Sequence, residues 1–366
     1  MVVTLARPVL LTATTPARSS SRYESNMDYA ALRKEVVEAG LLRRQYGYYA
    51  YKISLTVGLL ALSYLLLATI DNFAFQLFNA AFLAFAIVQI GYVMHDAIHM
   101  QIFRDKRNNE LAGVLFGSLT INSSTSWADL HLKHHRAPNH VDLDPDVNMP
   151  VLAFSEEQAL SKKGIAKFFA KHQAFFWFPL LTTVAFIMRF GNTVTLVKNL
   201  RSKRWKFHIV EAVFLLGGAT LYFGLIFNFL NFTQAIIFLL VNHVLTGVYM
   251  GTSFATNHKA MPLLKQKLDF LHMQVLTARN VKSNPVTDIW YGGLNYQIEH
   301  HLFPSMPRNN YGKANKIIKA FCRKNSIEHY ETGVFQTYKE ILQNFHQVTA
   351  ILRKPEPNIN QLTAAN

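Results

Sequence analysis

The chain has 366 residues, of which 50% are apolar and only 16% are charged, and its net charge is +15. The positive charge lies beside long apolar runs, which favours an anionic membrane surface over nucleic acid as its partner. A single cysteine, Cys322, excludes an internal disulfide framework and any metal site built from four thiolates.

The first 26 residues are rich in Arg, Ser and Thr, and no acidic residue precedes Glu24. This composition is typical of a disordered tail, although an organellar transit peptide shares it. We therefore expect an N-terminal tail and a pre-membrane helix over 1–45.

Four stretches are long and apolar enough to cross the roughly 30 Å of a bilayer's hydrocarbon core. They are residues 53–70, 73–94, 209–229 and 232–254. Short turns at Asn72 and Asn231 separate the members of each pair, which predicts transmembrane hairpins at 46–94 and 209–254. Lys and Arg occur beside the two hydrophobic pairs and not within them, so the positive-inside rule places both termini in the cytoplasm.

The segment 95–208 between the hairpins is expected to be cytoplasmic. Its apolar stretch at 111–121 is too short to span and should pack beneath the bilayer. A second stretch at 174–190 contains Pro179 and four consecutive aromatic residues, a composition that suits the headgroup region. We expect this stretch to lie in the membrane interface; the alternative is an ordinary fifth span, which would separate the histidines before and after it.

The last segment, 255–366, is predicted to form a cytoplasmic helical cap. Apolar residues recur there at helical spacing, which indicates an amphipathic helix. They are Tyr338, Ile341, Leu342, Phe345, Val348 and Leu352. The predicted fold is thus an all-α integral membrane protein with four transmembrane helices in two hairpins and a cytoplasmic cap that holds a di-metal site.

Seven of the fifteen histidines lie in three short clusters near the predicted spans. The first cluster is His95 and His99, the second is His131, His134 and His135, and the third is Gln297, His300 and His301. On a helix, residues three or four apart share a face, whereas adjacent residues diverge by about 100°. The two adjacent pairs therefore indicate two metal ions rather than one. His258 brings the set to eight, or four imidazoles for each ion.

Imidazole ligands with open positions suit iron in oxygen chemistry, whereas zinc prefers four ligands in a closed site or three with water. No glutamate has a histidine three residues later, so the carboxylate-bridged centre of soluble four-helix bundles is excluded. A purely structural role is disfavoured because burying many polar rings without partners is costly. His243 is expected to be a packed polar residue or to line a cavity, and the remaining six histidines to have ordinary structural or surface roles.

Two long strings resemble the membrane-bound fatty acyl desaturase family, and the resemblance runs from about residue 40 to 330. They are HLKHHRAPNHVDLDPDV at 131–147 and GGLNYQIEHHLFPSMPR at 292–308. Gln297 in place of a histidine is similar to the front-end type, which adds a double bond between an existing one and the carboxyl end. Bacterial relatives with this motif also act on saturated chains, so the position of the double bond stays open.

The resemblance implies a di-iron centre with eight histidine ligands. These are His95, His99, His131, His134, His135, His258, His300 and His301. Gln297 is expected to act outside the ligand set, through a hydrogen bond or a water. Asp96, Asp144, Asp146 and Asp288 are placed to accept hydrogen bonds from ring N–H groups, with turn formation as the alternative for Asp144 and Asp146.

We expect an O2-dependent desaturase that inserts a cis double bond into a long acyl chain, carried as acyl-CoA, acyl-carrier protein or acyl-lipid. Trp127, Trp290, Tyr291 and Phe303 are expected to line the acyl tunnel or to belong to the core. The chain has no His-Pro-Gly-Gly signature of a fused haem domain, so electrons should come from a ferredoxin-like protein or reductase in trans. The expected location is a bacterial cytoplasmic membrane, with the metal site in the cytoplasm.

Two alternatives remain. A membrane di-iron hydroxylase of acyl chains or alkanes needs the same ligands and differs only in its product. From a different class, a histidine-rich metal transporter would hold its ligands at the bilayer midplane, and a haem-binding membrane protein would need only one or two axial ligands.

Overall fold

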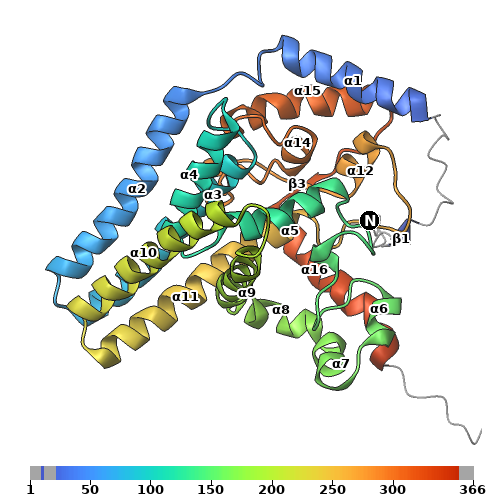
Figure 1. Cartoon of the computed structure of the whole chain (residues 1–366). Helices are drawn as coiled ribbons and strands as arrows, with labels where there is room; N and C mark the ends of the chain where they lie inside the picture. The colour runs from blue at the N-terminus through green and yellow to red at the C-terminus, as the bar shows by residue number, and fades with distance from the viewer. Residues whose placement is uncertain (1–9, 12–21, 354–366) are drawn as a thin grey trace, which may run out of the picture.

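The computed structural model describes residues 10–11 and 22–353, and it is mainly helical (Figure 1). Within these residues, four helices are long and apolar enough to cross a membrane. They are α2 (Tyr46–Thr69), α3 (Phe73–Ile98), α10 (Trp205–Phe229) and α11 (Phe232–Phe254). Each coincides with one of the predicted stretches, so the four predicted candidate spans are confirmed as helices. Most of the predicted N-terminal tail lies outside the described residues.

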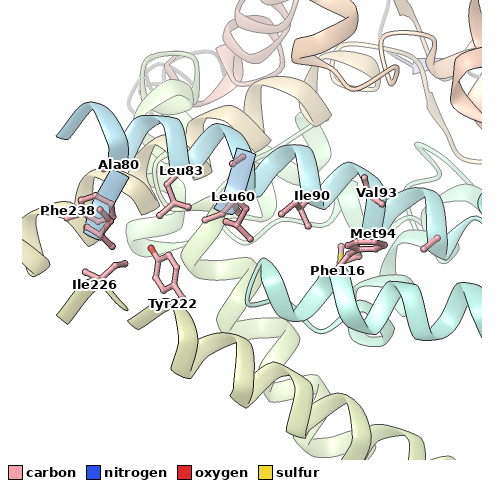
Figure 2. Close-up of a cluster of buried hydrophobic side chains, with 14 of the residues drawn as sticks. Leu60, Ala80, Leu83, Ile90, Val93, Met94, Phe116, Tyr222, Ile226 and Phe238 are labelled. Carbon is pink, nitrogen blue, oxygen red and sulfur yellow. The ribbon is translucent and has the colours of Figure 1, made fainter. Parts of the chain in front are cut away.

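The four long helices differ in how deeply they are buried. In α3 and α11 the most apolar window is 67% and 44% buried, compared with 22% in both α2 and α10. Figure 2 shows Leu83, Ile90 and Val93 of α3 among the side chains of this core, with Tyr222 of α10 and Phe238 of α11 nearby. Helix α3 is therefore central, and the outer helices leave apolar side chains for lipid.

Buried polar side chains link the long helices. Asn79 of α3 accepts a hydrogen bond from Ser63 of α2, over 2.7 Å. Asn242 of α11 donates to the carbonyl oxygen of Ala80 and accepts from the hydroxyl of Tyr222. Such contacts satisfy polar groups where no water is available and fix how the helices pack on one another.

The two short connections begin new helices as their asparagines predict. The side chain of Asn72 accepts from the backbone N–H of Phe75 at the start of α3. Asn231 accepts from the N–H of Gln234, whose side chain accepts in return from the N–H of Asn231. Each cap satisfies N–H groups that have no partner inside the helix.

Between α3 and α10 the chain forms shorter helices. They are α4 (Lys106–Leu119), α5 (Ser124–Arg136), the 3-10 turn η1 (Pro145–Val147), α6 (Glu156–Ser161), α7 (Gly164–Lys171), α8 (Gln173–Leu181) and α9 (Val184–Asn199). Helix α4 covers the stretch expected to be too short to span, and it packs against α3 and α10. Helices α8 and α9 meet at 69°, with Pro179 inside α8, so 174–190 is not one straight span.

The C-terminal part surrounds the ends of α3 and α11. Its elements are η2 (Ala255–Asn257), α12 (Phe270–Leu276), α13 (Pro285–Trp290), α14 (Gln297–Leu302), η3 (Arg308–Asn310), α15 (Tyr311–Lys324), α16 (Val334–Val348) and η4 (Ala350–Arg353). Two-residue strands pair in parallel, β1 (Leu10–Leu11) with β2 (Leu263–Leu264) and β3 (Asn280–Val281) with β4 (Glu331–Thr332). Helix α16 buries Ile341 and Phe345, as its spacing predicts. Helix α1 (Arg22–Glu38) packs against α12 and α15 (Figure 1).

Candidate metal centre

The histidine clusters lie on or next to different helices, and the fold brings them together at one place. His95 lies in the last turn of α3 and His99 directly follows that helix. Helix α5 carries the second cluster and is capped at its N-terminus by Ser123, whose hydroxyl accepts from the N–H of Ser126. The third cluster lies on the six-residue helix α14, and His258 follows η2 beyond the end of α11. Residues more than two hundred positions apart in sequence, from His95 to His301, thus meet at the ends of two long helices.

The eight histidines form two groups, in each of which one nitrogen per ring lies within 4.8 Å of the others. The five-histidine group contains His95, His99, His131, His135 and His300. The three-histidine group contains His134, His258 and His301. The adjacent residues of each pair go to different groups, which follows from their divergence on a helix. The rings group as five and three, whereas four imidazoles for each ion were expected; how many rings each ion takes stays a prediction.

In the three-histidine group every outer ring nitrogen faces a hydrogen-bond acceptor. His134 Nδ1 lies 2.8 Å from Asp144 Oδ2, and His301 Nδ1 lies 2.8 Å from Gln274 Oε1. His258 Nδ1 lies 3.0 Å from the carbonyl oxygen of Thr277. A carboxylate or carbonyl oxygen only accepts, so Nδ1 of each ring carries the hydrogen and its Nε2 carries a lone pair.

These lone pairs point at one another. The Nε2 atom of His258 lies 3.3 Å from that of His134 and 3.0 Å from that of His301. Three acceptors cannot hydrogen-bond among themselves, and facing lone pairs at these distances repel. A cation between the rings turns the repulsion into three coordination bonds. The donor set therefore fits a metal ion, and the orientation of each ring is fixed from outside, as is usual for metal-binding histidines.

The five-histidine group is equally compact but has fewer outer partners. The Nε2 atom of His131 lies 2.9 Å from that of His99 and 3.0 Å from that of His135. The Nε2 atom of His135 lies 3.0 Å from that of His300. Among the described residues, neither nitrogen of His95 has a hydrogen-bond partner, and Nδ1 of His135 has none. Buried imidazole nitrogens without partners are costly, so this group too fits a metal ion.

The protonation of the rings supports the same conclusion. Burial lowers the pKa of most of these rings well below the ordinary value, and neighbouring rings lower it further, which keeps them neutral and able to coordinate. This applies to His131, His135, His258, His300 and His301. At His134 burial also opposes the charge, but the hydrogen bond and charge of Asp144 outweigh it and raise the pKa of the ring. Asp144 thereby makes His134 a more basic donor.

Gln297 lies beside the smaller group. Its Nε2 atom is 3.0 Å from His258 Nε2, and its Oε1 atom accepts from Asn257 Nδ2 over 3.0 Å. The side-chain amide thus contacts the same nitrogen of His258 that faces His134 and His301.

The four acidic residues expected near the rings behave differently. Asp144 contacts His134 as described above, and Asp146 Oδ2 is 3.7 Å from the same nitrogen, on a side chain that is 55% exposed. Asp96 Oδ1 lies 3.6 Å from His95 Nδ1, too far for a hydrogen bond. Asp288 accepts from Ser283 and Asn295, and within residues 22–353 it contacts no ring of the two groups. Its expected contact is wrong because the turn before α14 uses the carboxylate.

Asp96 instead forms a buried ion pair with Arg308, with 2.9 Å between Oδ2 and Nε. Arg308 also donates to the carbonyl oxygen of Gly292 over 3.0 Å. Gly292 has a φ of +58°, and a Cβ there would lie 2.3 Å from the ring of Tyr92. Only glycine fits this close approach, which ties the loop before α14 to α3.

Several contacts of the histidine groups could not be predicted from the sequence. Gln274 and Thr277 hold His301 and His258, and Tyr311 Oη lies 3.0 Å from His300 Nδ1. The spacing of residues in α12 does not predict that Gln274 contacts a histidine. The contact of the Thr277 carbonyl oxygen does not depend on the type of side chain, so the sequence cannot predict it. Arg308 ends the second string that resembles the family, so that string was the one available signal.

The other histidines lie apart from both groups. His243 Nδ1 donates to the carbonyl oxygen of Leu239 and the ring stacks on Phe186, which is the packed role expected. None of the other six belongs to a histidine group in the described residues: His140, His172, His208, His272, His329 and His346. Among the four aromatics, Trp127 lines a pocket with His95, Trp290 stacks on Tyr249, and Tyr291 and Phe303 are buried.

Comparison with known proteins identifies the scaffold. The family model described as fatty acid desaturase matches residues 72–333. The Delta(8)-fatty-acid desaturase of Euglena gracilis is 30% identical over 83% of this chain and 74% of that protein. The acyl-lipid (9-3)-desaturase of Physcomitrium patens is 26% identical over 88% of this chain and 62% of that protein. The Delta(6)-fatty-acid desaturase fat-3 of Caenorhabditis elegans is 27% identical over 86% and 73%. The chain belongs to the fatty acid desaturase family, and it is a membrane enzyme that desaturates fatty acyl chains.

Proposed function

We propose that this desaturase inserts a cis double bond into a long acyl chain, carried as acyl-CoA or acyl-lipid, at two non-haem iron ions. The observation that carries the proposal is the set of inward-facing nitrogen lone pairs in two adjacent groups. In the overall reaction O2 takes two hydrogens from neighbouring methylenes, with two electrons and two protons, and leaves as two waters. When bound, the two irons would supply the activation of O2 that no side chain can provide.

The proposed ligands are the eight histidines, five on one ion and three on the other. Gln297 is proposed to act beside the smaller group, and Asp96 to act from outside through Arg308. The protein's own contribution is position: Asp144, Gln274 and the Thr277 carbonyl oxygen set the tautomers and aim the rings. Burial of the rings keeps water away from the reacting carbon atoms.

We propose that the long helices form two transmembrane hairpins, 46–94 and 209–254. The segments 95–208 and 255–366 would then lie on one side of the membrane. Residues 1–45 would precede the first hairpin on the same side. Histidines before and after α8 and α9 share one site, which requires an even number of crossings between them. Helices α10 and α11 provide two, so the bent α8–α9 pair would enter the interface without crossing.

The lack of Lys and Arg within 53–94 and 209–254 supports a cytoplasmic metal site, because basic flanks stay in the cytoplasm. The three relatives described above are eukaryotic, so they give no support to the expected bacterial membrane. We further propose that a separate ferredoxin-like protein or reductase supplies the electrons. The net charge of +15 favours an acidic donor.

The proposed function is tested by expressing the full chain in a host with defined lipids and analysing its fatty acids by gas chromatography and mass spectrometry. We expect new acyl species that are two mass units lighter than their precursors. Species about sixteen units heavier would identify a hydroxylase instead. The His301→Ala variant is the matched control and should give no new species.

A further inference from the structure

A pocket next to the metal centre contains a buried arginine that has no counter-charge. His95 and Trp127 line this pocket, which is partly open to its surroundings. Its walls are otherwise mainly apolar, with Ile87, Val88, Met94, Met188, Met250 and Phe254 among them. Arg189 of α9 lines the same pocket and is 9% exposed.

The guanidinium of Arg189 is only partly satisfied. Its Nε donates to the carbonyl oxygen of Thr120 over 3.2 Å. Among the described residues, the two terminal nitrogens are buried without a hydrogen-bond partner, and no acidic side chain pairs with Arg189. Every other buried arginine that the structure describes has an acidic partner: Arg308 has Asp96, and Arg279 has Glu340.

An unpaired buried charge is strongly unfavourable, and arginine cannot relieve it by losing its proton. Its planar fork matches two oxygen atoms of a carboxylate or phosphate. The walls around it suit an acyl chain, and His95 places one metal group at the same pocket. A ligand that combines an apolar chain with an anionic oxygen group would satisfy all of these features.

We propose that Arg189 binds the anionic oxygen group at the carboxyl end of the acyl substrate. This inference rests on the proposed function and adds to it the chemical class of group that the site recognises. Because Arg189 and His95 share one pocket, the substrate's carboxyl end lies on the same side as the metal centre, and methylenes on the carboxyl side of the chain are presented for reaction. The group is a phosphate of an acyl-lipid, or the carboxylate of a fatty acid if the enzyme takes the free acid in place of the esters proposed above.

The test measures binding through the fluorescence of Trp127, which lies in the pocket. The purified full chain with its bound metal, kept without reductant, is titrated with brominated stearate, brominated phosphatidic acid and brominated methyl stearate. Bromine quenches a nearby tryptophan. Quenching that persists in Trp127→Phe would place the probe elsewhere and overturn the assignment of the pocket.

We expect Arg189→Gln to weaken binding of one charged probe by at least about tenfold and to leave the methyl ester unchanged. The probe that weakens identifies the group as a carboxylate or a phosphate. Lys198→Gln, which removes an exposed cation from the same helix, should change neither. Equal affinities for all three probes in Arg189→Gln and in the unchanged chain would overturn the proposal.

Two further variants guard against misfolding. Arg189→Lys keeps the charge and should retain the preference for the charged probe over the ester; its loss would count against the proposal. Arg189→Met removes an uncompensated charge, so we expect higher thermal stability without ligand and no stabilisation by the charged probe that stabilises the unchanged chain. Stabilisation equal to that of the unchanged chain would contradict us.

Desaturation is assayed separately by gas chromatography. A chain that binds stearate through Arg189 but forms no double bond would contradict the proposed function alone. An active chain whose Arg189→Gln variant keeps full affinity would contradict only this inference.

Discussion

The two histidine groups differ in how the protein holds them. In the three-histidine group Asp144, Gln274 and the Thr277 carbonyl oxygen each fix one ring. In the five-histidine group His95 has no hydrogen-bond partner among the described residues. The smaller group has fewer imidazoles, and each ring is oriented by a contact from outside. A group of few rings therefore depends more on its outer contacts than a group of many.

The largest effects should come from the neighbours His300 and His301, which serve different groups. We expect alanine at either position to lower product at least about 100-fold, because each removes a metal donor. His301→Ala should lower bound metal more, since only two rings remain in its group. Metal content by plasma mass spectrometry and product by gas chromatography check this. Full activity in either variant would remove that residue from the site.

Replacing Asp144 should sharpen the comparison. Asp144→Asn removes the negative charge that raises the pKa of His134, and we expect metal affinity to fall about 10- to 100-fold. Competition with a chelator measures the change. The control Asp146→Asn alters an exposed carboxylate 3.7 Å from the same ring and should have little effect. Equal losses in both variants would show that general charge, not the contact, is responsible.

Gln274 should have a smaller effect because its contact with His301 is uncharged. We expect Gln274→Ala to weaken metal binding about tenfold. Gln274→Glu keeps an acceptor for His301 but loses the donation to the carbonyl oxygen of His135, and it should retain most of the metal. If the glutamate variant loses as much metal as the alanine variant, the donated bond matters more than the acceptor.

The smallest effect on metal content is expected for Gln297→His. The change adds an imidazole beside His258 and makes the smaller group four histidines. We expect the variant to keep its metal, with a several-fold change in rate or a shift in the position of attack. Complete loss of metal would show that the pocket around Gln297 has no room for a ring.

Much of this arrangement is readable in the sequence. The lengths of the uncharged apolar stretches predict the long helices. Adjacent histidines such as His134 and His135 must point in different directions on any helix. The division into five and three is not readable, because it depends on how α5 and α14 rotate against each other. The same holds for Arg308, whose partner Asp96 lies 212 positions earlier and is set by tertiary packing alone. Local periodicity predicts which residues share one face of a helix. It does not predict which helix faces pack against each other.

The most direct test is the metal content and spectrum of the purified chain. We expect two irons per chain and no Soret band of haem, since eight imidazoles in two groups can hold two ions. One ion or none after full loading with iron, or a haem spectrum, would contradict the di-iron centre.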